Sequence, residues 1–337
     1  MQNSVTIIAS GASIATGAAA ARVAIPKAQS GEFPRFIRVA ASATASIRLG
    51  TQAVAVTAVA AAAGTVYAPT DTVTLTGGTF SAATVLTVAT TKIISAAVNA
   101  AGTGYVPNDT VTLAGGTFTT AGIFTVTHTK VVSATIVAAG SGGTNGAQTV
   151  TGTTGTGTKF QASVTITGGV ITAVNSISLA GDYTANPTIA ADPVTGPGPL
   201  TGATLAVVMG VLTTTVTNAG VYSVNAAAFT QSATSGVGTG VTFNTTVFGV
   251  NTVTVTTPGN YSVLPANPVA QGASSGAGTG ATFTMTWSNT GLAATTADTQ
   301  IQPGDALTMH IPNGVTDISA IQLTVAGTVQ ISALENM

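Results

Sequence analysis

The sequence contains few of the groups that carry chemistry or cross-link a small fold. Its 337 residues include no cysteine, and only 5% are charged and 5% aromatic. Between Pro193 and Ala297 there is no Asp, Glu, Lys or Arg. The lack of cysteine excludes a disulfide scaffold. A net charge of −1 argues against an electrostatic nucleic-acid binder, so we expect no nucleic-acid partner.

Long apolar runs are also missing. A membrane-spanning helix needs about 20 mainly apolar residues, and Thr, Ser or Gly interrupts every candidate run. The stretch 5–21 has no basic leader before it, so we interpret it as mature sequence rather than a signal peptide. We therefore expect no membrane insertion.

The scarcity of charge does not indicate disorder. Disordered chains combine low hydrophobicity with high net charge. Here 45% of residues are hydrophobic and the mean hydropathy is +0.51. We expect a folded chain whose polar surface consists mainly of Thr, Ser, Asn and Gly.

A tyrosine recurs with a period close to 39 residues, and one expected position lacks it. Such a period is typical of a repeat architecture. The copies beginning at Tyr67 and Tyr105 are nearly identical, and a third copy near Thr144 has lost its tyrosine. The predicted copies, about six in number, begin near residues 67, 105, 144, 183, 222 and 261.

Each copy alternates apolar and polar residues with period two, as in TVTL at 72–75 and TVTVT at 252–256. This alternation is typical of β-strands, and Val and Thr favour the extended backbone. Glycine pairs at 77–78, 115–116 and 168–169 lie where hairpin turns require positive φ. Only the amino-terminal Ala-rich tracts suggest any helical period. The fold class that we predict is all-β.

A 39-residue unit without cysteine is too small to bury a core alone. The units must therefore pack against one another, against other subunits, or both. Uncharged strand edges are also templates for aggregation unless they are covered. We expect a homo-oligomer and favour a trimer. Whether the repeats form separate small sandwiches or an intertwined shaft stays open.

The two flanks differ from the repeats in charge. Five of the eight Lys and Arg residues lie between Arg22 and Arg48, and four of the nine acids lie from Asp298 onward. This complementarity predicts that the flanks pair and close one small β-sandwich or jelly-roll-like base domain. Residues 1–60 and 292–337 would form this domain, and residues 61–291 would be a repeat insertion into one of its loops.

No catalytic constellation emerges. His128 and His310 lie far apart in sequence without a nearby cysteine or paired carboxylate, so we interpret both as strand residues rather than metal ligands. No nucleophile with a base and an orienting acid appears, and the acids are too sparse for a glycosidase pair. We predict no catalytic residues, no metal site, no cofactor and no enzymatic activity.

Two acids occupy the same place in successive repeats. Asp71 and Asp109 each follow a repeat tyrosine by four residues. One carboxylate per repeat cannot bind Ca²⁺ alone, so we favour a side chain that caps its own turn. The GTG stretches at 155–157 and 238–240 lack the helix and Lys-Ser/Thr ending of a phosphate loop.

The basic residues of the first flank are the candidate docking site. They could contact an acidic protein shell, and their number is too small for nucleic-acid binding. These candidates are Arg22, Lys27, Arg35, Arg38 and Arg48.

The repeat tyrosines have two interpretations. They could form an exposed stripe that stacks on sugars, or each could fill a joint between successive units while its hydroxyl reaches solvent or backbone. We favour the joint. The candidate joint residues are Tyr67, Tyr105, Tyr183, Tyr222 and Tyr261.

The flanks carry RVAIPKAQSGEFPRFIRVAA, SIRLGT, TADTQIQPGDALTMHIP and ISAIQLTVAGTVQISALE. In these segments the chain resembles small virion proteins of tailed bacteriophages that decorate or cement the capsid. The insertion, with NAGVY, PGNY and AGTGY, resembles Gly/Thr-rich repeats of phage fibres and other appendages. The resemblance implies a base domain that binds the capsid shell and a projecting repeat arm.

Three functions follow. The chain could be a structural virion protein that binds the major capsid protein or another virion protein. It could instead be a tail fibre, appendage or adhesin whose repeats bind host surface glycans. A binder of ice or crystals would need a flat, regular Thr array, which a 39-residue unit with irregular turns does not offer. We expect the first, located on the virion.

Overall fold

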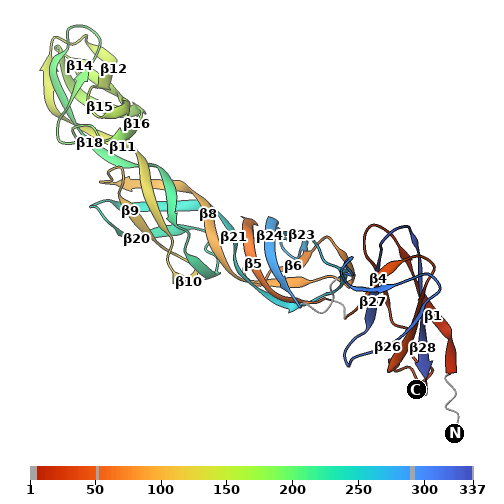
Figure 1. The fold of residues 1–337 in the computed structure, drawn as a ribbon. Helices are drawn as coiled ribbons and strands as arrows, with labels where there is room; N and C mark the ends of the chain where they lie inside the picture. The colour runs from red at the N-terminus through yellow and green to blue at the C-terminus, as the bar shows by residue number, and fades with distance from the viewer. Residues whose placement is uncertain (1–5, 51–52, 289–292, 336–337) are drawn as a thin grey trace.

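The computed structural model describes residues 6–50, 53–288 and 293–335. All regular secondary structure in these ranges is β-strand, which confirms the all-β prediction. The Ala-rich tracts, which alone suggested a helical period, form strands and the bends between them. A β-sandwich lies at one end of the molecule and a long arm extends from it (Figure 1). Strands β12, β14 and β15 lie at the far tip of the arm.

The sandwich is the base domain, and both flanks build it. One sheet has the order β1-β28-β3-β26 and the other β2-β27-β4-β25, all antiparallel. The strands are β1 (Thr6–Thr16), β2 (Ala21–Ala24), β3 (Phe36–Ala41), β4 (Ala45–Gly50), β25 (Thr299–Ile301), β26 (Ala306–His310), β27 (Asp317–Gln322) and β28 (Gly327–Glu335).

Strand pairing rather than charge joins the two flanks. Each sheet alternates strands from the two ends of the chain, and alternate residues such as Ile37, Val39, Ile318 and Ile331 fill one core between the sheets. In the base domain, Arg48 and Asp298 form an ion pair, at 3.7 Å. The stabilisation of the base domain therefore comes mainly from apolar burial.

The arm contains twenty strands, which run outward and then return. Those before the tip are β5 (Ala55–Thr65), β6 (Thr72–Leu75), β7 (Thr79–Ala82), β8 (Val85–Thr103), β9 (Thr110–Ala114), β10 (Thr117–Thr120) and β11 (Ile123–Ser141). Those of the tip are β12 (Gly146–Gly152), β13 (Thr156–Thr158), β14 (Gln161–Thr167), β15 (Val170–Leu179), β16 (Asp182–Ala185) and β17 (Asp192–Thr195). The returning strands are β18 (Thr201–Asn218), β19 (Val221–Val224), β20 (Phe229–Thr234), β21 (Thr239–Thr257), β22 (Asn260–Val263), β23 (Val269–Ser274) and β24 (Thr279–Trp287).

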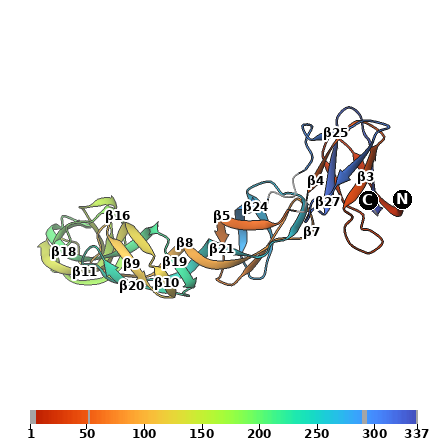
Figure 2. The ribbon, with the colours of Figure 1, turned by 60° about the horizontal axis from the view of Figure 1, so that its bottom comes forward.

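These strands pair in a nested way. β5 pairs with β24, β8 with β21 and β11 with β18. The first long strand of the insertion thus pairs with its last, the second with the second to last, and so on toward the tip. The repeats therefore do not follow one another along the arm in sequence order. The array folds back on itself, and copies from its two halves lie side by side (Figure 2).

Three apolar cores divide the arm into units. The proximal unit buries Tyr67, Leu86 and Phe283, the middle unit Tyr105, Phe124 and Phe243, and the distal unit Phe160, Tyr183 and Leu205. The long strands β8, β11, β18 and β21 each contribute to two successive units. Each core thus combines an outbound and a returning repeat, which overcomes the small size of a single repeat. The expected boundary at 291/292 lies outside the described residues.

All six glycines of the three Gly-Gly turns have positive φ, as expected. Only the pair at 168–169 is a two-residue hairpin, because Thr167 and Val170 on its two sides are paired. Beyond Gly77-Gly78 and Gly115-Gly116 the next strands, β7 and β10, pair instead with β22 and β19. At two of the three predicted hairpins, the strand after the turn therefore pairs with a distant returning strand and not with its sequence neighbour.

Candidate functional sites in the arm and the base domain

All five tyrosines are buried, with at most 1% of each residue exposed. The two outbound tyrosines share one environment. Tyr67 donates its hydroxyl hydrogen to the side-chain oxygen of Gln271, and Tyr105 does the same to Gln231 at 2.5 Å. Each ring packs on a glycine of the returning chain, Gly278 or Gly238. These tyrosines therefore tie the outbound repeat to the returning one.

The other three tyrosines, one on the tip strand β16 and two on returning strands, share a different environment. Their hydroxyl oxygens accept hydrogen bonds from backbone amides, at 2.7 Å for Tyr183, 2.9 Å for Tyr222 and 3.0 Å for Tyr261. The donors are Phe160, Gly122 and Thr84. The regular tyrosine period in the sequence thus covers two structural classes, which the spacing alone does not separate.

At each contact between units, an outbound tyrosine meets the segment that follows a later tyrosine. At the proximal–middle joint, Asn225 donates its side-chain amide to the backbone oxygen of Tyr67 at 2.8 Å. Three residues before Asn225 lies Tyr222, paired with Thr91. At the middle–distal joint, Asn186 makes the same contact with Tyr105, also at 2.8 Å. Tyr261 lies where the arm begins and exchanges backbone hydrogen bonds with Ala53.

The joint geometry accounts for the missing tyrosine. Gly143 stands 38 residues after Tyr105, where the third outbound tyrosine would be. No further unit follows the distal unit, so there is no joint to fill at that position. A side-chain carbon at Gly143 would lie 2.9 Å from Ile166 and 3.2 Å from Leu200. Aliphatic side chains thus occupy the space beside this glycine and close the tip.

Burial changes the acid–base behaviour of the joints. It raises the pKa of Tyr67, Tyr105, Tyr183 and Tyr222 above the ordinary value near 10, because a phenolate would lose its hydration. Backbone hydrogen bonds to the hydroxyls oppose this effect but are the smaller influence. The four joint tyrosines are therefore neutral donors or acceptors over the physiological range.

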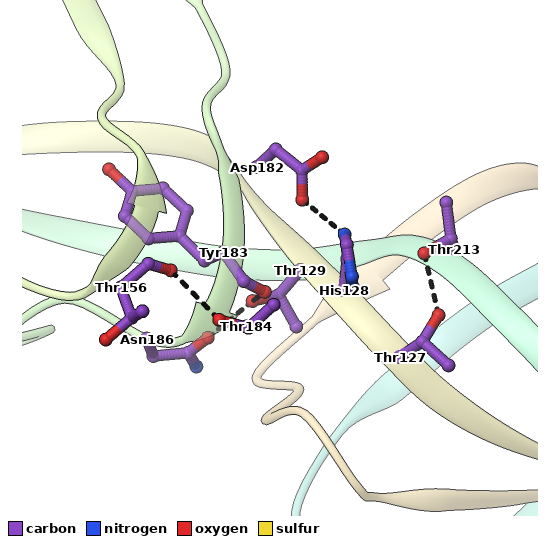
Figure 3. Close-up of polar contacts among 9 residues, drawn as sticks. All are labelled: Thr127, His128, Thr129, Thr156, Asp182, Tyr183, Thr184, Asn186 and Thr213. Carbon is purple, nitrogen blue, oxygen red and sulfur yellow. Dashed lines mark hydrogen bonds and ion pairs between the residues drawn. The ribbon is translucent and has the colours of Figure 1, made fainter.

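The middle–distal joint also contains a histidine–carboxylate contact (Figure 3). His128 on β11 approaches Asp182 on β16, with Nδ1 and Oδ1 2.5 Å apart. Our interpretation of His128 as a strand residue is confirmed, but the nearby acid was missed because 54 residues separate the two in sequence. His310, also in a strand, contacts the ring of Phe36, with ring centroids 5.2 Å apart. Neither histidine belongs to a group of His, Cys, Asp or Glu residues that could hold a metal within the described residues.

The other acids of the arm accept hydrogen bonds from the chain itself. Asp71 accepts a hydrogen bond from the backbone amide of Ala68 at 2.8 Å, and Asp109 accepts one from Val106 at 2.9 Å, which confirms the turn-cap interpretation. Asp192 is fully buried in the distal unit and accepts hydrogen bonds from the amide and hydroxyl of Thr154. These carboxylates are hydrogen-bond acceptors within the arm.

The five candidate docking cations separate into two groups. Arg22 and Arg48 lie on the sheet that faces the arm, beside the acids Asp317 and Asp298. Burial lowers the pKa of Arg22, and the charge of Asp317 opposes that shift. The pKa of Asp298 is lowered, chiefly because its carboxylate accepts the backbone amide of Thr295. Both arginines therefore interact with acids of the base domain itself.

Lys27, Arg35 and Arg38 are exposed. Arg38 lies on the outer face of the sheet β1-β28-β3-β26, paired with Ser332 and Thr308. Figures 1 and 2 place this sheet on the side of the base domain away from the arm. Lys27 lies over the ring of Phe33, 5.5 Å from its centroid. Phe33, Pro34, Arg35 and Ile311 line a pocket of about 260 Å³ at one end of the sandwich.

The described residues contain no helix long and apolar enough to cross a membrane. Comparison of the chain with protein-family models, with curated proteins and with solved structures finds no match.

Proposed function

We propose that this chain is a non-enzymatic structural virion protein. Its base domain binds the shell of a phage capsid, stabilises it, and projects the arm outward. The observation that carries the proposal is the separation of two parts within one chain. Both flanks close a single sandwich, whereas one uninterrupted insertion runs out and back to form a long, nearly uncharged arm. Such a molecule is suited to attachment at one end and projection at the other.

The docking surface that we propose is the outer face of the sheet β1-β28-β3-β26. It carries small and polar side chains such as Ser13, Gln330 and Thr308, with Arg38 among them. Arg35 and the pocket beside Phe33 lie near the end of the same sheet. The partner is the major capsid protein or another virion protein that presents acidic side chains to these arginines.

Oligomerisation belongs to the same proposal. The sandwich leaves β1 and β26 at the edges of one sheet and β2 and β25 at the edges of the other. Unpaired edges of uncharged strands associate readily. A homo-oligomer, with a trimer favoured, would cover some of these edges on the particle.

The test uses the full chain and purified empty capsids in a co-sedimentation assay. We expect the chain to sediment with capsids and the double variant Arg35→Glu, Arg38→Glu to bind about tenfold or more weakly, because charge reversal opposes an acidic partner. The matched control Lys92→Glu reverses a charge on the arm and should bind normally. Unchanged binding of the double variant, or loss of binding in Lys92→Glu, would refute this docking surface.

The alternative is an appendage or adhesin whose repeats bind host glycans. The tyrosines cannot supply its stacking surface, because at most 1% of each is exposed. Two phenylalanines on the arm are exposed, however, and they keep a carbohydrate-binding role open for the arm.

A further inference from the structure

Phe80 and Phe118 are exposed aromatic residues at equivalent places in successive repeats. They stand 38 residues apart, and 42% of Phe80 and 39% of Phe118 is accessible. Each lies on a short strand, β7 or β10, whose four residues are all exposed. Among the described residues of the arm, these are the only large exposed aromatic side chains.

A buried tyrosine supports each of these rings. Phe80 contacts Tyr261, with ring centroids 5.3 Å apart, and Phe118 contacts Tyr222 at 5.8 Å. The same tyrosines are the register partners of the two phenylalanines. A ring held on one side by a fixed neighbour loses little conformational entropy when a ligand covers its other side.

The strands that carry both rings and their partner tyrosines contain no charged residue. Each ring stands on a strand of small and hydroxylated residues, TFSA at 79–82 and TFTT at 117–120. Val263 and Val224, 45% and 55% exposed, follow the two supporting tyrosines. No charged residue occurs at 72–91 or 110–127, nor anywhere at 193–297. These strands supply no counter-charge for an anionic ligand, whereas a neutral ligand with an apolar face matches the exposed phenylalanine and valine.

We propose that Phe80 and Phe118 form two binding sites for one neutral polysaccharide chain. A hexopyranose ring has an apolar face of C–H groups that can stack on an aromatic ring. Each patch contains one aromatic ring and one valine, far less than the about 800 Å² per partner of a stable protein interface. Repetition of the site on successive units suits a polymer that repeats along its own length.

The distal unit provides an internal contrast. There the register partner of the equivalent tyrosine, Tyr183, is Gly157, which has a φ of +121° and no side chain. The site therefore occurs on the proximal and middle units and is absent from the described distal unit. Two linked sites also predict avidity, since the second ring binds a chain that the first already holds.

This proposal is independent of what the base domain binds. It is tested with the full chain by affinity electrophoresis in native gels that contain dextran, hydroxyethylcellulose or amylopectin. We expect at least one of these neutral polymers to retard the chain. Phe80→Ala and Phe118→Ala should each weaken the retardation about tenfold, because an aromatic contact is lost. The double variant should lose it entirely because no second site remains.

Two variants keep the outcome interpretable. Phe80→Tyr with Phe118→Tyr preserves the rings and should retain binding. Val237→Ala removes an apolar side chain that is 84% exposed elsewhere on the arm and should change nothing. The proposal is overturned if no neutral polymer retards the chain, if the double alanine variant is retarded like Val237→Ala, or if only dextran sulfate binds. If the alanine variants change the sedimentation coefficient of the chain but leave its retardation unchanged, the two phenylalanines form an interface between copies. That result would also overturn the proposal.

Discussion

The side-chain amide of Asn186 donates a hydrogen bond to the backbone oxygen of Tyr105 at 2.8 Å, across the joint between the middle and distal units. Asn225 makes the same bond to Tyr67 one unit closer to the base. Each asparagine also accepts the hydroxyl hydrogen of a buried threonine, Thr129 or Thr91. Because a carbonyl and a hydroxyl both depend on one side-chain amide, each asparagine holds its joint together through two hydrogen bonds.

Replacing either asparagine should loosen one joint. Asn186→Ala or Asn225→Ala leaves a carbonyl and a buried threonine hydroxyl without their partner, at a cost of about 1–3 kcal/mol. Hydrogen exchange measured by mass spectrometry should increase around the affected joint and stay unchanged at the other. Asn175→Ala is the control, because Asn175 is exposed and bonds only with Thr165 in the distal unit. Uniform exchange across the arm would contradict a local role.

The contact between tyrosine and glycine should tolerate no added methyl group. A side-chain carbon at Gly238 would lie 2.3 Å from the ring of Tyr105, and one at Gly278 equally close to Tyr67. Gly238→Ala and Gly278→Ala should therefore destabilise the arm by about 1–3 kcal/mol through overpacking. Thermal unfolding followed by circular dichroism measures the change. Gly17→Ala, whose new carbon meets no atom closer than 4.0 Å, should leave the transition where it is.

Alkaline solution should unfold the arm. The pKa of Tyr67, Tyr105, Tyr183 and Tyr222 is raised by burial, so above pH 10 the unfolded chain releases protons that the folded chain retains. The unfolded state then binds fewer protons, and the free energy of unfolding falls as the pH rises. Below pH 10 this contribution is fully present. Phenolate absorbance near 295 nm should appear together with loss of the far-ultraviolet strand signal, whereas ionisation well before unfolding would show that the hydroxyls are open to solvent.

Strand positions followed from the sequence because period-two alternation is a local property. Val73 and Leu75 alternate with threonines and are buried as that pattern requires. The turn cap of Asp71 was predictable for the same reason, since the amide that it binds lies three residues away. The joining of both flanks in one domain was suggested by charge, and Arg48 and Asp298 form an ion pair there, although strand pairing achieves the joining.

The nested topology could not be predicted from one sequence. Copies that are nearly identical, such as those at Tyr67 and Tyr105, do not pack as a pair; they pair with copies about 200 and 120 residues later. The choice between a sequential and a folded-back array depends on these long-range pairings, which periodicity does not record. The contact of His128 with Asp182 and the exposure of Phe80 were hidden for the same reason.

The nested topology makes a prediction about deletions that a sequential array does not. Thr129 and Val211 are register partners at the middle–distal joint, so replacing residues 130–210 by Asn-Gly should close β11 and β18 with a two-residue turn. The base domain, proximal unit and middle unit keep their cores, and small-angle X-ray scattering should show a shorter arm on a folded protein. Removing residues 222–260, one repeat length, takes Tyr222 and Phe243 from the middle core and Val250 from the proximal core. This smaller deletion should unfold both units, and equal tolerance of the two deletions would show that the repeats fold independently.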